Sequence, residues 1–250
     1  QIGYLIPCTG NDLTVGYTYL RPSDTDSAVS PSGFIALVPA TRVGVAIGGL
    51  DTVRAKAEMD LNAVDVEAGQ RFTTGAYDMR MFGALRYASI DYTLQSAGHV
   101  FNGGGAFGYQ QFTSNFRGLG PRIGVDGRYC LQSGFGLDAN LSTSLLVGTV
   151  DGKYDASEVA GNVRNVGYTA NNGSRNRVVP VLEAKLGVDY THIVDRCSKS
   201  SLVFEGGYQV TNYFNAVDHT RVVNNFAIVS QNTTSDVGYD GIYFGVKYYA

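Results

Sequence analysis

The chain contains no tryptophan, and only 16% of its 250 residues are charged. It has no run of lysine and arginine, and its formal net charge of -3 offers no attraction to a polyanion, so nucleic-acid binding is not expected. No apolar stretch approaches the roughly 18 residues that a membrane-spanning helix needs. If the chain enters a membrane, it must therefore do so with strands.

Residues that carry chemistry are also scarce. The three histidines lie far apart in the sequence, and no glycine-rich segment has the form of a phosphate loop. Cys8, Cys130 and Cys197 are an odd number with no metal-ligand spacing. They are either isolated thiols or include one disulfide formed in an oxidising periplasm. We therefore expect no enzyme, no catalytic residues, no cofactor and no metal site.

The abundant residues favour strands and turns, because the chain has 32 glycines, 17 tyrosines and 12 phenylalanines. Apolar residues alternate with polar or small ones most clearly over residues 135–147, where only Leu146 breaks the pattern. The segments with this alternation lie near residues 13–19, 64–72, 79–87, 119–131, 135–147, 182–190, 202–211 and 242–248. We therefore predict eight strands.

The connections between these segments alternate in length. Three are short, near 73–77, 132–134 and 195–200, and four are long, near 21–59, 93–116, 150–177 and 214–238. Outer-membrane barrels have short periplasmic turns, long external loops and an even number of strands. The chain is therefore predicted to be all-β, a closed antiparallel transmembrane β-barrel that forms one domain over residues 1–250. Both termini are predicted to be periplasmic, with residues 1–11 as a periplasmic N-terminal segment.

The strand count has an alternative. Residues 42–47 and 53–59 also alternate, so they predict either an extension of the second strand or a further hairpin that would give ten strands. The apolar positions change parity between Met59 and Val64, which predicts a bulge or turn there.

The two faces of the predicted strands differ sharply in charge. The apolar face carries almost no charge, as expected for a band facing lipid, where a lysine or arginine at the bilayer midplane costs about 2–4 kcal/mol. The residues predicted to face the lumen are Asp65, Glu67, Arg71, Arg80, Arg86, Arg122, Asp126, Arg128, Asp138, Glu183, Lys185, Asp189, Glu205 and Lys247. Aromatic girdles at the membrane interfaces are predicted at Tyr17, Tyr19, Tyr87, Tyr129, Tyr190, Tyr208 and Tyr248.

The state of the lumen stays open from the sequence. The interior of an eight-stranded barrel is only about wide enough for side chains to fill it, so balanced charges can pair across strands. A narrow, weakly selective aqueous path is the alternative, since glycines on the inner face leave space. These glycines are Gly16, Gly124, Gly187, Gly207 and Gly245.

The segments Phe116–Gly124 and Ser144–Gly148 resemble the Legionella-type major outer-membrane protein family. Residues 63–69, 82–88 and 204–208 support this resemblance. It implies a pore-forming or structural barrel in the outer membrane of a Gram-negative bacterium, and it supplies no catalytic residues.

Three functions are compatible with these patterns. The first is a porin-like or structural barrel that passes small polar solutes or ions if its lumen is open. The second is a closed barrel whose external loops act as an adhesin or protein-binding surface, and the third is a soluble lectin-like β-sandwich. The expected partners of a barrel are outer-membrane lipid, with a homo-oligomer and other surface or cell-envelope proteins as further candidates.

Overall fold

The structure is a computed structural model that describes residues 1–7, 9–29, 35–37, 47–50, 52–99, 107–160, 163–195, 200–222 and 230–249. Its strands are β1 (Ile2–Leu5), β2 (Asn11–Leu20), β3 (Ser23–Val29), β4 (Ile35–Leu37), β5 (Ile47–Leu50), β6 (Thr52–Thr74), β7 (Tyr77–His99), β8 (Phe107–Cys130), β9 (Phe135–Ala160), β10 (Val163–Asn171), β11 (Arg175–Asp195), β12 (Ser200–Val222) and β13 (Ser230–Tyr249). A 3-10 helix, Gln132–Gly134, links β8 to β9. No helix in the described residues is long and apolar enough to cross a membrane.

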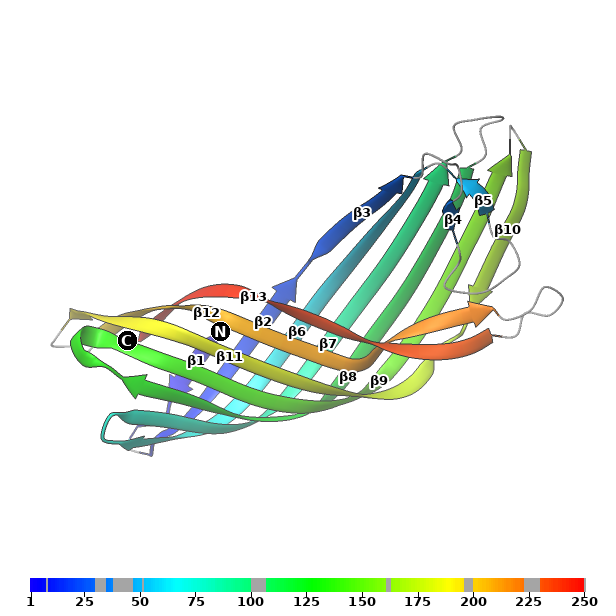
Figure 1. Cartoon of the computed structure of the whole chain (residues 1–250). Coiled ribbons are helices and arrows are strands. Elements are labelled where there is room, and N and C mark those ends of the chain that lie inside the picture. The colour runs from blue at the N-terminus through cyan, green and yellow to red at the C-terminus, as the bar shows by residue number, and fades with distance from the viewer. Residues whose placement is uncertain are drawn as a thin grey trace.

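The strands form one large, curled antiparallel sheet in the order β1-β2-β6-β7-β8-β9-β11-β12-β13 (Figure 1). Strand β3 continues the pairing of β2 along β6, β10 pairs with β9, and β4 and β5 make a separate pair. The path from β2 to β13 contains eight long strands, which coincide with the eight alternating segments of the sequence. The all-β antiparallel prediction is therefore confirmed.

Tight turns join the long strands at one end. Gly75 adopts a positive φ of 60° between β6 and β7, and Gly134 one of 86° before β9, a conformation that glycine reaches without strain. The backbone N–H of Cys130 donates to the carbonyl of Ala76 over 2.8 Å, so the two turns lie side by side. These are two of the three short connections predicted from the sequence.

The segments predicted as long loops are instead largely strand. Strands β6, β7, β8 and β9 contain 23, 23, 24 and 26 residues, or about 80 Å at roughly 3.4 Å per residue. A transmembrane strand needs only about 9–11 residues. Strand structure therefore continues through residues 52–59, 93–99, 107–116, 150–160, 163–171 and 214–222.

The predicted break between Met59 and Val64 is wrong. Strand β6 pairs with β7 without a register shift from Thr52 opposite His99 to Thr74 opposite Tyr77. Residues 53–59 are therefore the first part of β6 and not an arm of a further hairpin, while residues 42–46 lie outside the described residues. The parity of the apolar positions changes because the surroundings of the two faces change along the strand, as shown below.

The first and last long strands keep one edge each outside this sheet. Among the described residues, β13 pairs only with β12, and β2 pairs with β6 and β1. The structure is thus a curled sheet of the β-barrel type, in which closure is not seen.

Candidate functional site: the two faces of the sheet

Every long strand exchanges the polarity of its two faces at one point along its length. We call the part next to the short turns the proximal half and the remainder the distal half. The boundary lies between residues 63 and 65 in β6, 86 and 88 in β7, 118 and 120 in β8, 144 and 146 in β9, 181 and 183 in β11, 211 and 213 in β12, and 239 and 241 in β13.

The outer face of the proximal half is apolar and exposed. Val66 is 52% exposed, Ile123 62% and Leu186 69%, although soluble proteins seldom expose so many aliphatic side chains together. The same face includes Leu13, Val15, Val64, Met79, Met81, Leu85, Leu119, Leu137, Leu141, Leu145, Val147, Leu182, Val188, Phe204, Val210, Ile242, Phe244 and Val246. A surface of this composition and extent suits contact with lipid.

Aromatic side chains lie on the same outer face. Near the short turns, the rings of Tyr77 and Tyr129 have centroids 4.9 Å apart, as do those of Phe135 and Tyr190. The tyrosines predicted for the girdles are all exposed, namely Tyr17, Tyr19, Tyr87, Tyr129, Tyr190, Tyr208 and Tyr248. Their amphipathic rings suit the interface between hydrocarbon and water.

The distal half has the opposite arrangement. Its inner face is a buried apolar cluster that contains Leu61, Ile90, Phe116, Leu146 and Val150. Its outer face carries residues such as Asp60, Asp91, Asn115, Asp151 and Lys153. Leu146, the exception in the sequence pattern, is therefore the first residue of the inner cluster on β9. The distal half is built like a protein in water, and the proximal half like a protein in lipid.

Outer-face charges of the distal half pair locally. Lys56 Nζ lies 2.5 Å from Glu58, and Lys153 Nζ lies 2.8 Å from Asp155. Each ammonium group lowers the pKa of the neighbouring carboxyl through a side-chain hydrogen bond. These are solvated surface pairs, which contribute little to stability.

The inner face of the proximal half is crossed by a buried network of charges. Arg122 of β8 reaches Glu67 of β6 over 2.6 Å and Glu183 of β11 over 2.8 Å. Arg86 of β7 donates two hydrogen bonds to Asp65, of 2.6 and 2.7 Å. Its Nη1 atom also lies 2.9 Å from Glu183, outside hydrogen-bond geometry. These contacts join strands that are not neighbours in the sheet, so the network spans the concave interior.

The network continues toward the turns through Arg80. Its guanidinium lies 2.9 Å from Glu67, 3.0 Å from Asp126 and 2.7 Å from Asp12. Arg71 also reaches Asp12, over 3.2 Å. Asp12 was missed in the sequence analysis, although it shares the parity of Thr14 and Gly16 in the first strand and could have been found by extending that pattern by two residues.

A second group of charges lies on the other side of the interior. Arg128 donates to Asp189 over 2.9 Å, and Lys247 Nζ lies 2.5 Å from Glu205. Lys185 stands over the ring of Tyr243 at 5.7 Å, and the Tyr243 hydroxyl donates to Asp138 over 3.3 Å. All fourteen charges predicted for the inner face therefore lie opposite the apolar outer face, and the structure joins them into two groups.

The glycines that suggested an open path are mostly covered. A Cβ at Gly124 would lie 2.4 Å from the Phe82 ring, one at Gly187 2.5 Å from the Tyr243 hydroxyl, and one at Gly245 2.5 Å from Glu205. At Gly207 it would meet the carbonyl of Leu186 at 2.2 Å, whereas Gly16 has room. Neighbouring side chains and backbone thus occupy most of the space that these glycines leave.

A bulge in β12 covers the distal interior. The register with β13 shifts between Tyr213 and Val217, and Asn215 takes a positive φ of 58°. Beyond the bulge, the backbone N–H of Asp218 donates to Ser114 Oγ of β8 over 3.1 Å, and the Asp218 carboxylate lies 3.1 Å from Arg177. Strand β12 therefore packs across the concave face instead of leaving it open.

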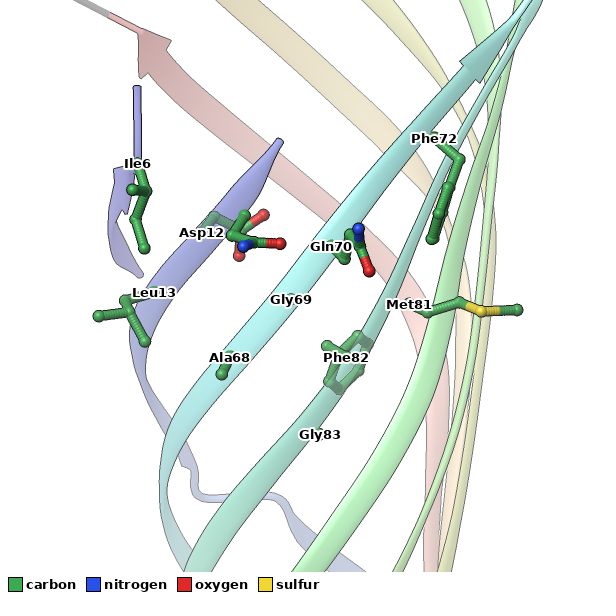
Figure 2. Close-up of a pocket in the computed structure, with 11 residues that line it drawn as sticks. Ile6, Asp12, Leu13, Ala68, Gly69, Gln70, Phe72, Met81, Phe82 and Gly83 are labelled. Carbon is green, nitrogen blue, oxygen red and sulfur yellow. The ribbon is translucent and has the colours of Figure 1, made fainter. Parts of the chain in front are cut away.

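Figure 2 shows a hollow of about 520 Å³ at the proximal end of β2, β6 and β7. Its lining is mainly apolar and includes Ile6, Leu13, Phe72 and Met81, while Asp12 is already bonded to Arg71 and Arg80. No group of three or more metal-ligating side chains occurs within the described ranges. The hollow therefore offers no assembled catalytic or metal-binding chemistry.

The cysteine prediction is only partly addressed. Cys130 is an exposed free cysteine beside the short turns. Cys8 and Cys197 lie outside the described residues, so their pairing stays a prediction.

The chain was compared with known families, curated proteins and solved structures. Neither the curated proteins nor the solved structures contain a match. The family model described as Legionella pneumophila major outer membrane protein precursor matches residues 1–250, the whole chain. This is a family of outer-membrane proteins and not of enzymes, and an outer-membrane protein associates with membrane lipid. The chain therefore belongs to the family of the Legionella pneumophila major outer membrane protein.

Proposed function

We propose that this protein is a sealed outer-membrane barrel that does not conduct and that acts through its projecting distal half as a structural or binding surface. The observation that carries the proposal is the exchange of polarity between the two halves of every long strand. A single β-sheet needs this exchange when one half lies in hydrocarbon and the other in water.

The exchange also locates the membrane. From the boundary to the short turns, β6 runs from residue 64 to residue 74, close to the roughly 9–11 residues of a transmembrane strand. The short turns and both termini then lie in the periplasm, and the distal half projects from the outer surface of the cell. On this assignment the lumen-facing charges are those of the proximal network.

Sealing is supported by two layers in series. The proximal interior is bridged from β7 to β11 by ion pairs among Arg86, Arg122 and Glu183. The distal interior is filled by the cluster around Phe116 and covered by β12. A path for hydrated ions would have to pass both layers, so we expect no porin activity.

Closure follows from the lipid environment. An open strand edge in hydrocarbon leaves backbone N–H and C=O groups without partners, at a cost of several kcal/mol each. The proposed barrel is therefore closed between β2 and β13, with eight wall strands.

Planar bilayer recordings of the purified protein test sealing. We expect no single-channel steps at high salt, with a known porin in the same bilayers as the positive control. Uniform steps that scale with the amount of protein would contradict the sealed barrel and favour a porin.

An epitope inserted between Asn172 and Gly173 tests the projecting half. This turn between β10 and β11 lies beyond the distal part of β9. We expect antibody to label intact cells, whereas an epitope inserted at Gly75 should be labelled only after the outer membrane is permeabilised. The reverse pattern would overturn the assigned orientation.

A further inference from the structure

One edge of β2 has two potential occupants. Its other edge is fully engaged by β6, from Asn11 opposite Gln70 to Leu20 opposite Leu61. On the edge that faces away from β6, β1 pairs with Asp12–Val15 only, with Ile2 opposite Val15 and Leu5 opposite Asp12. The edge of β13 that faces away from β12 has no partner strand among the described residues.

The direction of the strands makes the two occupants exclusive. Each step along the path from β2 to β13 is antiparallel, and eight strands make seven such steps, so β13 runs antiparallel to β2. Strand β1 is also antiparallel to β2. An antiparallel seam between β13 and the proximal part of β2 therefore needs the place that β1 holds.

The faces of β13 suit this place. Its outward residues Ile242, Phe244, Val246 and Tyr248 are exposed and apolar, as are Leu13, Val15, Tyr17 and Tyr19 of β2. Its inward positions include Gly241 and Gly245, which can approach Thr14 and Gly16. Strand β2 has 10 residues, which a strand of the length of β13 can cover from end to end.

Strand β1 is the weaker occupant. It contributes four residues, and Ile2, Tyr4 and Leu5 are 81, 64 and 56% exposed. Its first outward side chains, Ile2 and Tyr4, match Val15 and Leu13 across the pair, so it can cover the edge without inserting into the interior. Covered edges resist pairing with other chains.

We infer that β1 is a removable strap, which covers the edge of β2 while the sheet is open and yields it to β13 when the barrel closes. This inference rests on the proposed function, because a membrane supplies the demand for closure. It assigns to the N-terminal strand a role in the order of assembly: the strap protects the edge first, and the C-terminal strand replaces it last.

A reversible lock tests this competition. In a chain whose three cysteines are changed to serine, Ile2→Cys with Val15→Cys places two thiols directly across β1 and β2, where antiparallel neighbours have Cα atoms about 4.5–5.5 Å apart, within disulfide range. The matched control is Val66→Cys with Leu85→Cys, which lie opposite each other on β6 and β7. Folding into detergent or vesicles is followed by the mobility of unboiled protein on SDS gels.

We expect the oxidised lock to lose the heat-modifiable form and to regain it on reduction, while the oxidised control keeps it. In the reduced lock, thiols added one at a time at Ile242, Phe244 and Val246 should give one that forms a crosslink to Val15→Cys. An oxidised lock that folds as well as its reduced form would overturn the strap alone. Failure of the parent and both reduced variants to fold in any lipid or detergent would instead overturn the proposed function, and the strap with it.

Discussion

Replacing Arg122 by methionine should be among the most damaging single changes in the interior. Arg122 is only 8% exposed and faces three carboxylates, with Nη1 lying 2.6 Å from Glu67 and 3.5 Å from Asp65, and Nη2 lying 2.8 Å from Glu183. Two arginines, Arg80 and Arg86, would remain for these three buried acids. Removing one partner of a buried ion pair costs about 3–5 kcal/mol, because the other partner stays desolvated and unpaired.

The matched control is Arg71→Met. Arg71 is 38% exposed, and its partner Asp12 keeps its contact with Arg80. An exposed ion pair contributes less than about 1 kcal/mol, so the control should unfold close to the parent. Both variants are unfolded with urea in lipid vesicles and followed by circular dichroism, because the chain has no tryptophan to report the transition. The free energies are compared by linear extrapolation.

A second change separates charge from side-chain volume. Adding Glu67→Gln to Arg122→Met removes one of the acids left in excess, so part of the lost stability should return. Equal unfolding free energies for Arg122→Met and Arg71→Met, or no recovery in the double variant, would refute the view that the interior is held by mutual charge compensation.

Three further changes test other parts of the structure. Gly120→Ala should destabilise the sheet by about 1–3 kcal/mol through overpacking, since its Cβ would lie 1.9 Å from the carbonyl of Leu145, whereas Gly83→Ala meets nothing within 4 Å and should fold like the parent in the same urea titration. Ile123→Lys on the outer face of the proximal half should cost about 2–4 kcal/mol in lipid, while Thr149→Lys on the outer face of the distal half should change little; similar losses would contradict the assigned boundary. Cys130, kept as the single cysteine, should react with a membrane-impermeant maleimide only after the outer membrane is permeabilised, and rapid labelling of intact cells would place the short turns outside.

The proximal half could be predicted almost completely from the sequence. Alternation over about ten residues identified each strand, its outward residues and its inward charges, because lipid tolerates very few exceptions on the face that it contacts. Asp12 was missed only because the first strand was started at Leu13. The contacts of Arg122 with Glu67 and Glu183 could not be predicted, since they join strands separated by a third and depend on how far the sheet curls.

The distal half was misread for a physical reason. Its apolar residues, such as Ile90 and Phe116, occupy the inward parity, whereas a pattern fixed by Leu85 or Leu119 expects them outward. A search for one continuous alternation therefore ends at the boundary and assigns the remainder to loops. The polar outer residues Asp91 and Asn115 strengthen this error, because charged and amide side chains are common in turns.

The exchange of polarity also fixes the register of the long strands. A slip by one residue turns every side chain of a strand to the opposite face. In β7 it would move Arg86 into the membrane and Leu85 into the charged interior, and in the same step it would expose Ile90 to water and bury Asp91. A neighbour shifted in this way would be penalised in two solvents at once, so strands of this length, which could otherwise pair in many alignments, are left with a single favourable one.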